Sequence, residues 1–123
     1  MRLFVAVNAP GHFTGELATR LDAWRARLAV AWTRPETWHL TLMFLGEWPP
    51  ERAAALPAAL REEAAAHAPL LVQPGGVGAF PDLRAPRVLF LQFAPAGAAG
   101  DPLRALAAGV RARVEAVWPD GPQ

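Results

Sequence analysis

The sequence predicts an α+β fold, because short apolar strands and amphipathic helices follow one another at irregular spacing. A doubly wound parallel sheet would instead show strands and helices in regular alternation. The 123 residues, 53% of them apolar, suffice for one small domain with a real core, and they contain no repeat of solenoid length. We therefore expect a single domain over residues 1–123.

Apolar periodicity predicts a strand and a helix at the start of the chain. Residues 3–7 form a β-branched apolar run, which indicates a buried strand. Thr14 is a suitable cap for a helix whose apolar residues recur at steps of four, three and four and therefore share one stripe. This stripe consists of Leu17, Leu21, Trp24 and Leu28. A further short strand is expected over residues 30–33.

Residues 38–45 form the most informative predicted strand. Strict alternation along it separates two faces. The first face carries His39, Thr41 and Met43, and the second carries Leu40, Leu42 and Phe44. We therefore expect the side chains of His39 and Thr41 to project the same way, from Cα atoms about 7 Å apart.

The second half of the chain predicts two helices and three short strands. One helix should follow Leu56 in the sequence, with Pro57 in its first turn. Another should follow Asp101, with its apolar residues on one stripe up to residue 117. Strands are expected over residues 70–72, 77–80 and 87–93. Gly75 and Gly76 are interpreted as a turn, since no Lys-Ser/Thr pair follows to make them a phosphate-binding loop.

Composition excludes several classes of function. Twelve arginines oppose eleven acidic residues and the net charge is +1, so any contact with nucleic acid should be local. Cysteine is absent, which excludes disulfides and thiolate metal sites and favours the cytoplasm. No apolar stretch approaches the ~20 residues of a membrane helix, so no membrane association is expected.

The sequence contains three histidines that could carry chemistry, and it contains no serine, which excludes a serine nucleophile. His12, His39 and His67 do not show the spacing of a helical zinc site, so no metal is expected. His12 and Thr14 repeat the His-x-Thr spacing but should lie in a turn, off a strand. His67 is interpreted as a residue near a helix end.

His39 and Thr41 together offer a group that can transfer a proton and a hydroxyl that can donate a hydrogen bond. An imidazole can move a proton near neutral pH, and a neighbouring hydroxyl can hydrogen-bond a phosphate oxygen. On spacing alone, the sequence favours the alternative that both groups simply face solvent from a half-buried strand, because His-x-Thr is a short and common pattern.

The surrounding sequence favours the first interpretation. The run from Trp38 to Glu47, WHLTLMFLGE, resembles the first signature of the RNA 2′,3′-cyclic phosphodiesterases, also called 2′-5′ RNA ligases, of the two-histidine phosphoesterase superfamily. Residues 2–7 resemble the family's opening strand, residues 32–36 its approach to the signature, and residues 76–81 with 85–90 its middle hairpin. These similarities occur in the family's order along the chain.

The resemblance implies a bilobal fold with antiparallel sheets lining a central cleft, in which one phosphoesterase domain hydrolyses 2′,3′-cyclic phosphate ends of RNA or nucleotides to 2′-phosphates. His39 would be the proton donor and Thr41 would bind phosphate, while Leu40 and Leu42 are structural positions of the motif. Phe4 is a candidate for stacking the terminal base. No cofactor or metal is implied, and no protein partner is evident.

The family pattern also requires a second His-x-Thr on a later strand, which residues 1–123 do not contain. We therefore expect C-terminal strands beyond Gln123 that carry it. Two alternatives stay open: a 2′-5′ RNA ligase, which would use the same acid and base, and a non-catalytic domain that binds RNA ends and lacks the second motif.

Overall fold

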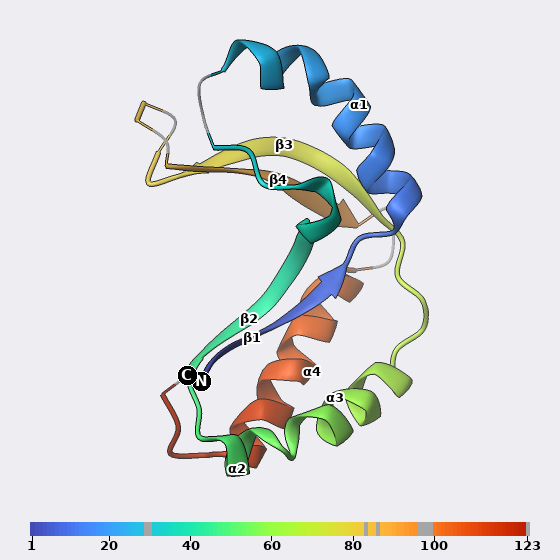
Figure 1. The fold of residues 1–123 in the computed structure, drawn as a ribbon. Helices are drawn as coiled ribbons and strands as arrows, with labels where there is room; N and C mark the ends of the chain where they lie inside the picture. Colours follow the sequence, from blue (N-terminus) through green and yellow to red (C-terminus); the bar gives the residue numbers. More distant parts are fainter. Residues whose placement is uncertain (29–30, 83, 86, 96–99, 123) are drawn as a thin grey trace. The chain divides into compact units, whose positions relative to one another are not determined.

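The computed structural model describes residues 1–28, 31–82, 84–85, 87–95 and 100–122. The chain forms two compact units: unit 1 comprises Met1–Ala53 with Asp120–Gln123, and unit 2 comprises Ala54–Pro119. Each unit contains helices and one antiparallel pair of strands (Figure 1). This mixture confirms the predicted α+β class.

Unit 1 contains β1 (Arg2–Asn8), α1 (Gly11–Arg27), the 3-10 turn η1 (Pro35–Thr37), β2 (His39–Glu47) and the short α2 (Pro50–Ala53). Strand 3–7 and the helix behind it are confirmed, but the prediction that Thr14 caps this helix is wrong. The helix begins at Gly11, and the buried Thr14 hydroxyl donates to the Gly11 carbonyl over 3.2 Å. The strand expected over residues 30–33 is not formed at 31–33, and residue 30 lies outside the described residues.

β1 and β2 pair in antiparallel fashion, and β2 carries two extra residues. Val5 lies opposite Met43 and Ala6 opposite Thr41, so Leu42 has no partner of its own. A second shift, between Leu3 and Phe4, leaves Leu45 without a partner residue on β1 as well. Each such bulge reverses the alternation of side chains beyond it.

The bulge at Leu42 overturns part of the predicted face assignment. β1 has no bulge, so Phe4 and Ala6, two residues apart, lie on the same face of it. Phe4 lies opposite Phe44, and Ala6 lies opposite Thr41. Phe44 therefore shares the face of His39 and Thr41, whereas Met43 turns to the opposite face, where it is 4% exposed.

Unit 2 contains α3 (Leu56–Ala65), β3 (Val72–Phe80), β4 (Val88–Pro95) and α4 (Pro102–Val117). Both predicted helices are confirmed, and the Asp101 side chain caps α4 by accepting from the Arg104 amide over 3.0 Å. The predicted turn at Gly75 and Gly76 is wrong. β3 runs through it, and these two glycines bulge opposite Gln92 of β4, because Pro74 pairs with Phe93 and Val77 with Leu91.

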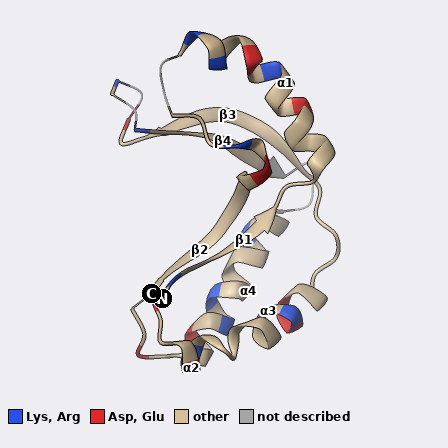
Figure 2. Ribbon diagram, in the orientation of Figure 1, with Lys and Arg blue, Asp and Glu red and all other residues tan. Residues whose placement is uncertain are grey.

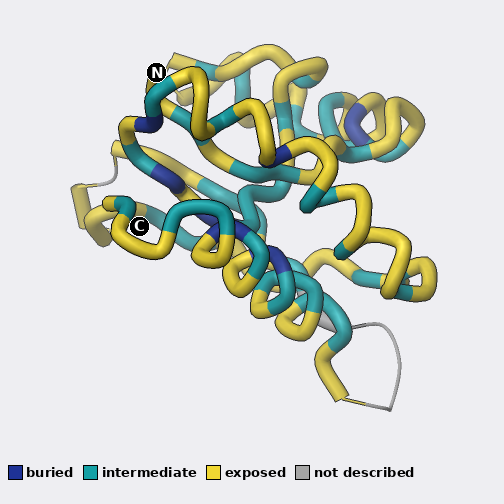
Figure 3. The backbone as a smooth tube through the Cα atoms, turned by 90° about the horizontal axis from the view of Figure 1, so that it is seen from below, coloured by how far each residue is buried: buried dark blue, intermediate teal, exposed yellow. Residues whose placement is uncertain are grey.

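The most deeply buried apolar residues of each unit lie along its strand pair or on its helices, and Figure 3 colours the backbone by burial. In unit 1 they are Met43, Leu45 and Trp48, and in unit 2 they are Leu56, Val110 and Val114. Val110 and Val114 lie on the stripe predicted for the last helix, whereas Trp24 and Leu28 of the first predicted stripe are exposed. Trp48 also joins the two ends of the hairpin. Its backbone exchanges two 2.8 Å hydrogen bonds with Met1, and its indole donates to the Leu45 carbonyl.

Charges of both signs are interleaved on the described helices (Figure 2). On α1, Arg20 pairs with Glu16 and Arg25 with Asp22, at successive turns. Neighbouring side chains on this helix therefore offset one another's charge.

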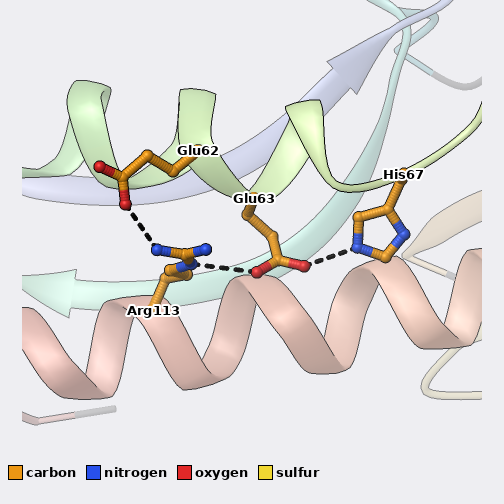
Figure 4. Close-up of polar contacts among 4 residues, drawn as sticks. All are labelled: Glu62, Glu63, His67 and Arg113. Carbon is orange, nitrogen blue, oxygen red and sulfur yellow. Dashed lines mark hydrogen bonds and ion pairs between the residues drawn. The ribbon is translucent and has the colours of Figure 1, made fainter.

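An ion-pair cluster connects α3 with α4 in unit 2 (Figure 4). The Glu63 carboxylate accepts from His67 Nε2 over 2.6 Å and from Arg113 Nε over 3.1 Å, and Arg113 also donates to Glu62 over 2.6 Å. Glu63 is only 13% exposed, while Glu62 lies largely in solvent. His67 lies just past the end of α3, as predicted.

These contacts favour the ionised form of Glu63. The hydrogen bond from His67, and then that from Arg113, hold the pKa of Glu63 below its ordinary value of 4.5, against the opposing effect of desolvation. Because the folded pKa is the lower one, the carboxylate stabilises the fold above about pH 4.5. That contribution disappears as the pH falls through the folded pKa.

Gly109 of α4 lies directly beneath the Glu63 carboxylate, and a Cβ at this position would overlap it. We expect Gly109→Ala to lower the free energy of unfolding by about 1 kcal/mol, since overpacking costs about 1–3 kcal/mol and the gain in helix propensity offsets roughly 0.5–1 kcal/mol. Chemical denaturation measures this directly.

The control repeats the substitution in a Glu63→Ala background. There the overlap is gone, so Gly109→Ala should raise stability through helix propensity alone. Equal destabilisation in both backgrounds would show that Glu63 does not occupy the space over Gly109.

Candidate functional site

His39 is the first residue of β2, opposite Asn8 of β1, and its side chain is exposed. Its Nδ1 lies 2.8 Å from the backbone carbonyl oxygen of Thr37. A carbonyl oxygen can only accept, so Nδ1 carries the hydrogen in this contact. Nε2 is then the nitrogen left to exchange a proton with another molecule.

The Thr37 carbonyl is held by the turn that precedes β2. Within η1, the Thr37 amide and hydroxyl both donate to the Arg34 carbonyl, over 2.9 and 2.7 Å. The Trp38 amide donates to Pro35, and the Trp38 indole donates to the Thr33 hydroxyl over 2.8 Å. The short sequence between Thr33 and Trp38 thus fixes the acceptor that orients His39.

Thr41 lies two residues beyond His39 and opposite Ala6. The ladder is regular from His39 through Leu40 to Thr41, so both side chains emerge on the same face, from Cα atoms about 7 Å apart. The residue between them, Leu40, pairs with Val7 and faces the other way. The structure therefore brings His39 and Thr41 together as the sequence predicts.

Two phenylalanine rings share this face. Phe4 stacks on the His39 imidazole, with ring centroids 5.1 Å apart and planes inclined by 27°, and it also meets Phe44 at 6.2 Å. Phe4 is 50% exposed and Phe44 is 75% exposed. Strict alternation had assigned Phe44 to the opposite face, and nothing in the sequence marks the bulge that returns it.

The remaining predicted residues occupy other places. Leu42 is the bulged, half-buried residue of β2. His12 lies exposed in the first turn of α1, off any strand as expected, and the His67 imidazole is engaged by Glu63. Across the ranges that the structure describes, no three His, Cys, Asp or Glu side chains gather as a metal site would require. No described helix is long and apolar enough to span a membrane.

This face combines three chemical groups. A histidine ring that is fixed at Nδ1 can donate or accept a proton at Nε2. A hydroxyl on the same face can hydrogen-bond an anionic oxygen, and the Phe4 ring lies against the imidazole. Such a combination is suited to acid or base catalysis on a small anionic group.

Comparison with known proteins gives consistent matches. The family described as LigT like phosphoesterase matches residues 13–90. An RNA 2′,3′-cyclic phosphodiesterase of Archaeoglobus fulgidus is 35% identical over 91 residues, which cover 74% of this chain and 51% of that protein. One of Thermus thermophilus is 36% identical over 118 residues, covering 94% and 56%.

Solved structures agree with these matches. A crystal structure of a Thermus thermophilus protein superposes with a TM-score of 0.76 at 33% identity, covering 98% of this chain and 63% of that one. A second crystal structure, described as a phosphoesterase, gives a TM-score of 0.62 at 27% identity. The chain spans about half the length of the two phosphodiesterases named above.

Proposed function

This chain belongs to the LigT-like phosphoesterase family, and on that premise we propose that it carries one half of an active site for hydrolysing 2′,3′-cyclic phosphate ends of RNA or nucleotides. The observation that carries the proposal is the placement of His39 and Thr41 on one exposed face, with Nδ1 of His39 engaged by Thr37. The names of the relatives supply the substrate class.

In the proposed reaction His39 is the general acid. A water oxygen attacks phosphorus, the bond from phosphorus to the ribose 3′ oxygen breaks, and Nε2–H of His39 delivers its proton to that departing oxygen. The product keeps the phosphate on the 2′ oxygen. The proton of the attacking water passes to a base that this pair of residues does not include.

Thr41 is proposed to bind the phosphate. Its hydroxyl would donate to a non-bridging oxygen, where negative charge grows as water adds to phosphorus. The β-strand keeps this donor at a fixed offset from His39, so that one bound phosphate can meet both groups without rearrangement of the backbone. Leu40, which faces away, would keep the strand anchored.

The regiochemistry of the product tests this assignment. We expect the natural polypeptide that contains these residues to convert a 2′,3′-cyclic nucleotide to the 2′-monophosphate, because the proton donor serves the 3′ oxygen. Phosphorus NMR, or chromatography against both monophosphate standards, identifies the product.

A 3′-monophosphate would contradict the leaving-group assignment. Adding an RNA with a free 5′ hydroxyl to the same assay separates hydrolysis from ligation. A hydrolase gives mainly the 2′-monophosphate, whereas joined 2′-5′ products in excess would favour the ligase.

A further inference from the structure

The contact between Phe4 and His39 spans an unusual distance along the hairpin. Phe4 lies opposite Phe44 and His39 opposite Asn8, so the two positions are four residues apart along the ladder, roughly 13 Å between Cα atoms. Their ring centroids are nevertheless 5.1 Å apart. Both side chains must therefore lean toward each other across Ala6 and Thr41, which are small enough to lie between them.

The imidazole is thus restrained in two independent ways. The Thr37 carbonyl holds the Nδ1 edge, which fixes one end of the ring, and the Phe4 ring lies against its face, which limits rotation of its plane. An exposed histidine without such contacts would exchange among several rotamers. Misplacement of a catalytic group by about 1 Å can cost roughly 10²-fold in rate.

We propose that Phe4 is a positioning residue, which holds the His39 imidazole so that Nε2 faces the phosphate bound at Thr41. The inference rests on the proposed function of His39. It replaces the expectation that Phe4 stacks on the terminal base of the substrate, because part of its ring surface is already used by the imidazole.

The test separates turnover from binding. In the natural polypeptide we expect Phe4→Leu to lower kcat for a 2′,3′-cyclic nucleotide by about 10- to 100-fold, with KM nearly unchanged. Phe4→Tyr keeps a flat ring of nearly the same size and should restore most of kcat. Thermal melting of each variant shows whether folding is preserved.

Phe44→Leu is the matched control. It removes an equally apolar and more exposed ring from the same face, one that contacts Phe4, and kcat should remain near the wild-type value. If KM rises in Phe4→Leu while kcat is kept, Phe4 binds the substrate base and the proposal is overturned. Unchanged kcat and KM would overturn it as well.

A spectroscopic measurement makes the inference independent of turnover. Stacking on Phe4 should shift the His39 ring protons upfield in proton NMR, and Phe4→Leu should remove that shift while Phe44→Leu keeps it. If the wild type shows the shift but hydrolyses no cyclic phosphate, the proposed function fails and the positioning geometry stands. If the shift is absent in the wild type, the positioning proposal fails by itself.

Discussion

Replacing His39 with alanine is expected to lower the turnover of a 2′,3′-cyclic phosphate by about 10²–10⁴-fold, the range of a lost general acid. Stability should change little. The side chain is exposed, and its removal sacrifices one hydrogen bond to Thr37 and the ring contact with Phe4. Steady-state kinetics and thermal melting on the same preparation measure the two effects.

His12→Ala is the matched control for this substitution. His12 is also exposed, and it shows the same spacing to a threonine, but it lies in the first turn of α1 instead of on a strand. Its loss should leave turnover intact. Wild-type turnover in folded His39→Ala would refute the assignment, and a comparable loss in His12→Ala would transfer the role to that residue.

Thr41→Val should slow turnover by about 10²–10³-fold, the usual effect of removing one donor to a developing anion. Valine keeps the β-branch that suits this strand and nearly the same volume, so the hairpin should fold as before. Kinetics and melting temperature, measured together, distinguish a lost phosphate contact from lost packing.

Thr41→Ser supplies the complementary variant, because serine keeps the hydroxyl and loses only a methyl group. We expect it to retain most of the activity that valine removes. A large drop in melting temperature with unchanged kinetics in Thr41→Val would instead mean that the hydroxyl has a structural role.

The placement of His39 and Thr41 on one face could be predicted from the sequence. Strand pairing is regular from His39 to Thr41, so period-two alternation determines the face. The same rule fails at the next residue. Leu42 is bulged, so Met43 and Phe44 exchange faces. Alternation contains no information about bulges, which depend on how the partner strand twists and packs.

At the glycines of β3 the sequence predicted a turn where the structure has a continuous strand. Gly75 and Gly76 have the composition of a turn, but β4 pairs on both sides of them and converts them into a bulge within one strand. Local composition could not show this, since the partner strand begins more than ten residues later. Tertiary pairing thus overrode the local preference.

The cluster around Glu63 was predictable only in part. Glu63 and His67 are four residues apart, which is the spacing of neighbours on a helix, so their contact could have been inferred. Arg113 is 50 residues from Glu63 along the chain, and the Glu63 carboxylate lies in the space over Gly109 of the same helix. Sequence periodicity identifies the apolar stripe of each helix but not which polar residues meet beside it.

The most direct test of the central claim is whether the importance of His39 depends on the leaving group. The natural polypeptide and its His39→Ala variant would be compared on a 2′,3′-cyclic phosphate and on its analogue with sulfur at the bridging 3′ position, because a thiolate departs without needing a proton. We expect the ratio of wild-type to variant turnover to be about 10²–10⁴ with oxygen and to collapse toward unity with sulfur. An equally large ratio on both substrates would contradict the assignment of His39 as the proton donor.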